Sequence, residues 1–267
     1  MLPTWLLYAT AVLFIVLAGT ALFFFTLTRG ALILRTVAGK ADSAAAHVYP
    51  IYSNMRLIRL VDWQPIIAAI LLFQYDRLVS AITSGLRQTD LRGKKVLITS
   101  CAFGNVIPRV VQASMDAGAS RVLVADIILN ELQHARTKLP AFAGRVDYIE
   151  ENATAMTLAD GSVDANVIFF LLHELPHELK GDALREACRV LAPGGKLYLA
   201  EFHRPEPWVL RALSWTYFKV FEPLGLALWD THDPVRQLQA MEGFSCERRT
   251  VFFGNFQVIV ATRKGPQ

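Results

Sequence analysis

The pattern of apolar and polar positions divides the chain into an apolar N-terminus, a connecting stretch and a region of alternating strands and helices. Residues 1–28 carry no charge and include an apolar run longer than the roughly 20 residues that cross a bilayer as a helix. The first positive charge, Arg29, follows this run, whereas a cleaved signal peptide has basic residues before a shorter apolar core. We predict a single transmembrane helix, and Arg29, Arg35 and Lys40 place the rest on the cytoplasmic side.

The connecting stretch, residues 29–89, begins with a small, polar linker at Gly39–Ala46. Trp63-Gln64-Pro65 separates two apolar helical patterns. The second, Ile66–Leu86, is apolar for about eight residues and then amphipathic, so its apolar stretch is too short to span a bilayer. It is suited to lying in the membrane interface, to capping a ligand pocket or to packing on the core. Four amphipathic aromatic residues here suit a boundary between apolar and wet surroundings or a pocket for a flat, lipophilic substrate: Tyr49, Tyr52, Trp63 and Tyr75.

Strand and helix patterns alternate from Lys94 onward, which indicates an α/β fold with a doubly wound, mostly parallel sheet. The stretch Lys94–Arg109 predicts a strand, a tight turn and a helix. Further strands are expected at 121–125, 145–150, 165–172 and 196–200, with helices at 106–117 and 181–191. Ser245–Phe253 and Phe256–Thr262 predict a hairpin joined by the two-residue turn Gly254-Asn255.

Composition and charge narrow the function classes. Hydrophobic residues make up 53% of the chain, which is high for a soluble domain and indicates contact with lipid. The net charge of +4 comes with no basic run interleaved with aromatics, so no nucleic-acid partner is expected. Cys101, Cys188 and Cys246 show no paired spacing, which argues against disulfides or a structural zinc site.

Ligands of doubly wound sheets bind outside the carboxyl ends of the strands, and several polar residues fall there. Asp126 follows the second strand at the offset from Gly104 where an acidic side chain accepts hydrogen bonds from both ribose hydroxyls; it is equally suited to capping the next helix. Cys101 either lies near a bound cofactor or fills space as a small buried residue at the strand end. The full set expected at this edge is Gly104, Asp126, Asn152, His173, Glu174, Glu201 and His203.

Several motifs carry a resemblance to a known family. Asp160–Asp164, the run R-V-L-A-P-G-G-K-L-Y-L-A at 189–200 and the acidic residue after the second strand resemble a class I S-adenosylmethionine-dependent methyltransferase over about residues 90–262. More narrowly, F-F-L-L-H-E at 169–174, F-H-R-P at 202–205 and F-E-P-L-G-L-A-L-W at 221–229 resemble the rhodoquinone biosynthesis methyltransferase family. The resemblance implies a Rossmann-like, seven-stranded sheet with an antiparallel C-terminal hairpin, and a catalytic domain at 90–267.

The resemblance also implies a cofactor, S-adenosyl-L-methionine. The residues expected to hold it are Thr99, Cys101, Gly104, Asp126, Asn152 and Ala153, with Asn152 accepting from the adenine amino group. Ordinary methyltransferases carry an acidic residue and three glycines in the first loop, whereas this chain has Thr99, Ser100, Cys101, Ala102, Phe103 and Gly104. This departure agrees with the narrower family, whose loop is also not of the ordinary type.

The narrower family acts on ubiquinone, replacing a ring methoxy group by an amino group with a divalent metal, manganese (Mn²⁺), as helper. His173, Glu174 and His203 are the expected catalytic residues and His173, Glu174 and Glu201 the expected metal ligands, because imidazole and carboxylate suit manganese or iron. A bound metal would polarise a quinone carbonyl as a Lewis acid. Alternatively, His173 and Glu174 form a structural pair, His177 caps a helix, and His203 with Arg204 binds a carboxylate or a phospholipid headgroup.

The sequence thus predicts a membrane-anchored enzyme with a lipophilic quinone substrate and membrane lipid as partners. Two alternatives stand beside amino-for-methoxy exchange. One is conventional methylation of a lipid or quinone precursor, and the other is a non-catalytic quinone-binding scaffold, which the glycine-poor loop favours.

Overall fold

The computed structural model describes residues 3–27, 30, 52 and 54–265, which fall into two compact units, Met1–Asn54 and Met55–Gln267. In the first unit, helix α1 (Thr4–Leu27) is long and apolar enough to cross a bilayer, since 24 residues extend about 36 Å. The predicted linker, Tyr49 and the positive charges Arg29, Arg35 and Lys40 lie outside the described residues.

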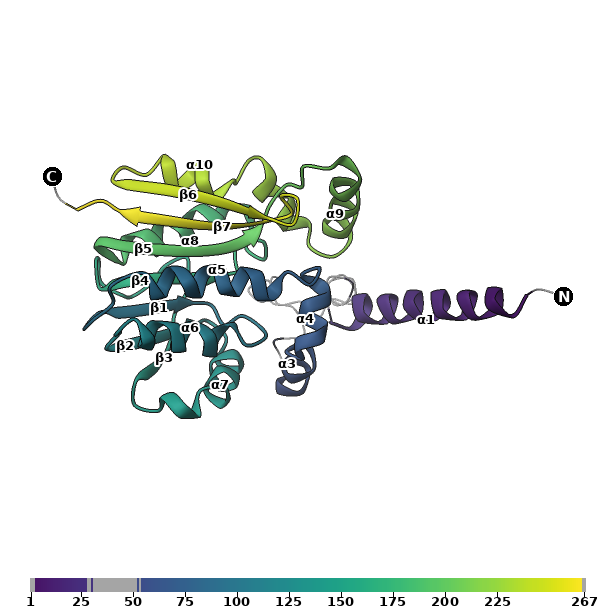
Figure 1. Ribbon diagram of the computed structural model, residues 1–267, viewed down its shortest axis with the longest axis horizontal. Helices are drawn as coiled ribbons and strands as arrows, with labels where there is room; N and C mark the ends of the chain where they lie inside the picture. The colour runs from purple at the N-terminus through teal and green to yellow at the C-terminus, as the bar shows by residue number, and fades with distance from the viewer. Residues whose placement is uncertain (1–2, 28–29, 31–51, 53, 266–267) are drawn as a thin grey trace, which may run out of the picture. The chain divides into compact units, whose positions relative to one another are not determined.

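The second unit is built on a seven-stranded sheet with the order β3-β2-β1-β4-β5-β7-β6 (Figure 1). The first five strands in this order are parallel, whereas β7 runs antiparallel to both β5 and β6. The strands are β1 (Lys95–Thr99), β2 (Arg121–Asp126), β3 (Val146–Glu150), β4 (Val163–Phe169), β5 (Leu191–Phe202), β6 (Phe244–Val251) and β7 (Phe256–Arg263). The predicted fold class is therefore confirmed.

Helices cover both faces of this sheet, because successive side chains of a strand point to opposite faces. In β1, Val96 and Ile98 pack into one hydrophobic cluster with α5 and α6, while Leu97 packs into a second cluster with α8. The helices of the second unit are α3 (Met55–Val61), α4 (Gln64–Ile70), α5 (Tyr75–Arg87), α6 (Val106–Asp116), α7 (Leu129–Thr137), α8 (His177–Arg189), α9 (Trp208–Val220) and α10 (Pro234–Gln239), with short 3₁₀ turns η2 (Pro140–Phe142) and η3 (Pro223–Trp229).

Several expected elements differ from the structure. The strand expected over 165–172 is β4 and ends at Phe169, because Phe170 adopts a positive φ. The helix expected over 181–191 is α8 and begins earlier, at His177, whereas Leu191 already belongs to β5.

The helix expected over Ile66–Leu86 is broken between α4 and α5, whose axes meet at 94°, because Leu72 and Phe73 adopt positive φ. The hairpin turn has four residues, Phe252–Asn255, rather than two, since Val251 already pairs with Phe256. Strand β5 continues to Phe202, so Glu201 lies inside the strand and not beyond it.

Candidate active site

The carboxyl ends of β1 and β4, which are neighbours in the sheet, are both shaped by an unusual backbone conformation. Ser100 after β1 has φ +73° and Phe170 after β4 has φ +56°, and neither is a glycine. Each is held by a hydrogen bond from its backbone N–H to the next strand, Ser100 to Ala125 O and Phe170 to Ala200 O. Such left-handed residues cost free energy and concentrate at functional sites, so this edge is the first place to look for one.

Asp126 is turned toward the loop that follows β1. Its Oδ2 accepts a hydrogen bond from the backbone N–H of Cys101 at 2.6 Å, and its Oδ1 accepts from the N–H of Ile128 at 2.8 Å. Burial raises the pKa of the Asp126 carboxyl, and these hydrogen bonds oppose that shift. Asp126 therefore ties the end of β2 to the loop, and it holds the chain just ahead of α7 without being that helix's N-cap.

A second carboxylate, which the sequence analysis missed, holds the same loop from outside. Asp62, between α3 and α4, accepts a hydrogen bond from the N–H of Gly104 at 2.7 Å. Lys138 donates to Asp62 at 2.6 Å and to the carbonyl of Gly104 at 2.9 Å, and His134 lies 2.9 Å from the other Asp62 oxygen. Asp62 is the only acidic residue between Met55 and Phe73, which was the available signal. We call Ser100–Gly104 with Asp126 the loop site.

The other predicted cofactor residues have local partners. The Thr99 hydroxyl is buried and donates to Asn166 in β4 at 2.8 Å. Asn152 is exposed, and its side-chain oxygen accepts from the N–H and hydroxyl of Thr154. Ala153 packs against the second hydrophobic cluster. Cys101 is 6% exposed, and burial, with the nearby charge of Asp126, raises the pKa of its thiol far above its usual range, so it remains uncharged.

The histidine site, which we define as His173, Glu174 and Glu201, is where the structure joins three of the predicted residues. Nδ1 of His173 lies 3.1 Å from Oε1 of Glu201, and Nε2 lies 3.9 Å from Oε1 of Glu174. Burial alone would lower the pKa of His173, but the charge of Glu201 and its hydrogen bond, followed by Glu174 and Glu222, raise it to about 9. The imidazole is therefore positively charged at neutral pH.

Lys180 supports this site and was not predicted. Its side chain is fully buried, and its ammonium donates to the carbonyl oxygens of Leu172 and Leu175, which flank His173 and Glu174. Burial lowers the pKa of Lys180 to about 8, although the nearby carboxylates oppose this. Gly225 in η3 packs closely against His173, since a Cβ at position 225 would lie 3.3 Å from the Cβ of His173.

Two other histidines of the predicted region, His203 and His177, lie apart from the histidine site. Nδ1 of His203 lies 2.7 Å from the carbonyl of Gly254 and Nε2 lies 3.3 Å from Arg248, so both ring nitrogens face the β6–β7 hairpin. His177 is the first residue of α8, and its ring stacks on that of His232. Among the described residues, no hydrogen bond or ion pair joins either histidine to His173.

Aromatic rings line the histidine site. The ring of Phe202 lies 5.0 Å from that of His173 and 4.9 Å from that of Phe170, both edge to face. Phe218 of α9 contacts Phe202 and Trp229, and the Nε1 of Trp229 is buried without a hydrogen-bond partner among the described residues. The imidazole of His173 therefore lies at one edge of a cluster of aromatic rings that extends through Phe202 and Phe218 to Trp229.

These residues do not fit the predicted manganese. The two ring nitrogens of His173 face opposite ways, one toward Glu201 and the other toward Glu174, so the three side chains do not converge on one point. In the part of the chain that the structure describes, no group of three or more His, Cys, Asp or Glu side chains is arranged to hold a metal ion. The metal assignment is therefore not supported, and no step below depends on it.

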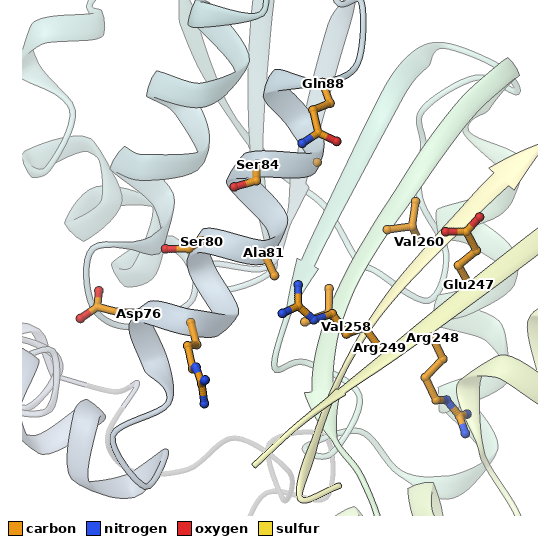
Figure 2. Close-up of a pocket in the computed structure, with 12 residues that line it drawn as sticks. Asp76, Ser80, Ala81, Ser84, Gln88, Glu247, Arg248, Arg249, Val258 and Val260 are labelled. Atoms are coloured by element: carbon orange, nitrogen blue, oxygen red, sulfur yellow. The ribbon is translucent and has the colours of Figure 1, made fainter. Parts of the chain in front are cut away.

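A separate groove of about 690 Å³ lies between α5 and the β6–β7 hairpin (Figure 2). Asp76, Ser80 and Ser84 line it from α5, and Glu247 and Arg249 from β6. None of the predicted site residues lines this groove.

Comparison with known proteins relates the sequence to one methyltransferase family. The family model described as the ubiE/COQ5 methyltransferase family matches residues 63–243. A relative named ubiquinone/menaquinone biosynthesis C-methyltransferase UbiE, from Methylobacterium nodulans, is 34% identical over 161 residues, which are 60% of this chain and 62% of the relative. The chain thus spans less than two thirds of that relative's length.

Solved structures agree on the fold alone. A possible exported protein from Bordetella parapertussis superposes with a TM-score of 0.55 at 18% identity, covering 70% of this chain and 67% of that one. The [4+2]-cyclase SpnF superposes with a TM-score of 0.52 at 16% identity, covering 72% and 81%. This fold therefore supports more than one chemistry. The family match, which extends over more than half of the sequence, is specific: the chain belongs to the ubiE/COQ5 methyltransferase family.

Proposed function

We propose that this chain is an S-adenosylmethionine-dependent enzyme that modifies the ring of a lipophilic quinone. The observation that carries the proposal is that the loop site and the histidine site lie at the carboxyl ends of β1 and β4, which are adjacent in the sheet. The chain that forms this sheet matches the ubiE/COQ5 methyltransferase family. In open α/β sheets this edge is where ligands bind. The UbiE relatives are named for methyl transfer in ubiquinone and menaquinone biosynthesis, which supports a quinone substrate.

The loop site suits S-adenosylmethionine by its charge. Asp126 lies 7% exposed beside the loop backbone, and Asp62 adds a second carboxylate against Gly104. When bound, the cofactor supplies an activated methyl group on a positively charged sulfur, and acidic surroundings favour a cation. Asp126, Cys101 and Gly104 would hold it, with Asn152 and Ala153 at the end of β3.

The histidine site suits the quinone. A carbonyl oxygen gains negative charge when its ring is attacked or reduced, and the protonated His173 would stabilise that charge, with Glu201 fixing the ring of the imidazole. Phe170 and Phe202 would hold the quinone ring edge to face. Exclusion of water by these rings strengthens the interaction of His173 with the oxygen.

Membrane contact would bring the substrate to the enzyme. A polyprenyl quinone stays in the bilayer, and α1 is long and apolar enough to anchor the chain there. Within the second unit, α9 exposes large apolar side chains, among them Trp208 at 77% and Leu213 at 65% exposed. These exposed residues support a face that rests on lipid, because Trp prefers the boundary between lipid and water. The proposed topology is a single pass with the catalytic domain, residues 90–267, on the cytoplasmic side.

The finer proposal is amino-for-methoxy exchange, as in rhodoquinone formation. The altered loop supports it, since Thr99–Gly104 lacks the acidic residue and two of the glycines of ordinary methyltransferases. In this reaction the amino nitrogen of S-adenosylmethionine would bond to the ring carbon, the bond from that carbon to the methoxy oxygen would break, and methanol would leave. The bond between the nitrogen and the cofactor's α-carbon would then be oxidised to an imine, with the quinone ring taking up the two electrons, and water would hydrolyse the imine to release the amino-substituted ring and a 2-oxo acid. Conventional C-methylation is the second candidate, and the UbiE relatives favour it.

The product mass tests these candidates. The full chain in mild detergent is incubated with short-tailed ubiquinone, or with its demethylated precursor, and S-adenosylmethionine, with and without added manganese and with a chelator. A quinone in which amino replaces methoxy supports exchange, and a precursor that gains one methyl group supports C-methylation. An unchanged mass with every substrate would contradict both and favour a non-catalytic quinone-binding protein.

A further inference from the structure

Glu131 in α7 is buried without a hydrogen-bond partner for one of its oxygens. The residue is 3% exposed, and its Oε1 contacts no donor among the described residues. A buried polar atom that lacks a partner costs free energy, of order 1–3 kcal/mol. Neither the packing of α7 nor the histidine site explains a carboxyl group at this position.

The groups around Glu131 locate its carboxyl. The charges that act on it are those of Asp126 at the end of β2, Lys138 after α7, Asp62 before α4 and Glu174 after β4. It acts in turn on the thiol of Cys101, after β1. Because β1 lies between β2 and β4 in the sheet, a group near all three strand ends lies over the carboxyl end of β1. Glu131 therefore lies near the loop site.

The balance of charge there is negative. Three further carboxylates lie within reach of Glu131, and the one ammonium, that of Lys138, is already bound by Asp62 and the carbonyl of Gly104. His134, from the same helix, also pairs with Asp62. Burial, followed by the charge of Asp126, raises the pKa of Glu131 to about 8. Without a ligand the group therefore holds a proton at neutral pH, and it would lose that proton beside a positive charge.

We propose that Glu131 is the counter-ion of the cofactor's sulfonium, and that it lets this glycine-poor loop favour S-adenosylmethionine over its uncharged thioether, S-adenosylhomocysteine. The inference rests on the proposed function, because it assumes that S-adenosylmethionine binds at the loop site. The loop itself has no acidic residue between Thr99 and Gly104, and Glu131 supplies a carboxylate from α7 instead.

This role has a defined pH dependence. Binding of the sulfonium requires Glu131 to be ionised, so affinity for S-adenosylmethionine should rise with pH up to about 8 and then level off. The rise can reach about tenfold per pH unit, the limit for one proton released. S-adenosylhomocysteine lacks the sulfonium, so its affinity should vary less. Cys101 does not titrate in this range, because the pKa of its thiol is far higher.

Calorimetry of the full chain in mild detergent tests the proposal. Each nucleoside is titrated between about pH 6.5 and 9 in buffers of different ionisation enthalpy, which count the protons released. The variants are Glu131→Gln, which keeps the shape, and Glu242→Gln, the same change at an exposed site far along the chain. The account predicts about one proton released for S-adenosylmethionine only, lost in Glu131→Gln and kept in Glu242→Gln.

Four other outcomes would overturn it. Equal pH dependence for both nucleosides, or an unchanged slope in Glu131→Gln, would remove Glu131 from this role while leaving the proposed function standing. If the unaltered chain binds no S-adenosylmethionine at millimolar concentration, the proposed function itself fails, and the inference fails with it. Should Glu131→Gln not fold, proton release by the unaltered chain still decides, since no release contradicts the proposal.

Discussion

Nδ1 of His173 lies 3.1 Å from Oε1 of Glu201, although the two residues are 28 positions apart and belong to different strand ends. Glu201 is completely buried, so its negative charge needs the imidazolium as a partner. The pair therefore fixes the protonation state of His173 and the position of the loop after β4. This relationship gives the first testable consequence.

Replacing Glu201 by Gln should lower the pKa of His173 from about 9, because burial is then opposed only by the weaker effects of Glu174 and Glu222. The folded pKa is raised, so the pair's stabilisation is complete below about pH 6.5 and is lost as the pH rises through about 9. It amounts to at most roughly 3 kcal/mol. Urea unfolding of both proteins should show a deficit for Glu201→Gln near pH 6 that narrows near pH 9.5. A deficit independent of pH would contradict this assignment.

Replacing Asp62 by Asn should weaken both the loop site and the fold. The change leaves Lys138 partly buried without its carboxylate and removes the charge that accepts from Gly104 N–H, at a cost of about 3 kcal/mol. Affinity for S-adenosylmethionine should fall as the loop loosens. Asp76→Asn is the control, since Asp76 is 82% exposed in its pair with Arg109 and such pairs contribute about 1 kcal/mol or less. Equal melting temperatures for the two variants would show that the contacts of Asp62 with Gly104 and Lys138 do not stabilise the fold.

Gly104→Ala should be more damaging than Gly93→Ala. Both glycines have positive φ, +83° and +73°, so both variants carry a backbone cost of about 1–2 kcal/mol. Only at Gly104 would the new Cβ also meet a neighbour, the hydroxyl of Tyr75 at 2.5 Å, whereas nothing lies within 4 Å at Gly93. Tyr75→Phe should recover part of the loss in the double variant. Unfolding free energies that match for Gly104→Ala and Gly93→Ala would show that Tyr75 gives way.

Lys180→Met should disturb the histidine site without touching it. Methionine fills similar volume but leaves the carbonyls of Leu172 and Leu175 without their donor, at a cost of about 2 kcal/mol or more. His173 and Glu174 lie between those carbonyls, so the quinone Michaelis constant should rise while affinity for S-adenosylmethionine stays near that of the unaltered chain. If the affinity for S-adenosylmethionine fell by the same factor as the quinone Michaelis constant rose, the variant would be generally unfolded, and Lys180 would have no specific role in positioning His173 and Glu174.

The sheet could be predicted from the sequence because its information is local. Apolar runs such as 165–172 locate the strands, although β4 itself ends at Phe169. Pro193-Gly194-Gly195 does not mark a strand end, because it lies inside β5, at an irregularity in the pairing with β4. The edge that gathers Asp126, His173 and Glu201 followed from the parallel topology. The break between α4 and α5 did not, because apolar periodicity continues through Leu72 and Phe73 while their backbone turns.

The missing part of the site depends on contacts between distant segments. Asp62 meets Gly104 across 42 residues, and Glu131 reaches the loop site only because α7 packs beside β2 and β3. A helix pattern marks Glu131 as one acidic residue of a first turn, which ordinarily favours the helix dipole. Only the folded structure shows that Glu131 is buried, and its proposed role depends on that burial. Likewise, the sequence grouped His203 with His173, whereas in the structure both ring nitrogens of His203 lie against the β6–β7 hairpin.

Transfer of atoms from the cofactor to the quinone tests the central claim most directly. The full chain would be given a short-tailed quinone and S-adenosylmethionine that carries isotopic labels in both its methyl group and its amino nitrogen, and the quinone ring would then be analysed by mass spectrometry. We predict one label in the ring, the nitrogen for exchange or the methyl carbon for methylation, and little of either in Glu201→Gln. An unlabelled quinone from fully folded, cofactor-bound protein would contradict the account.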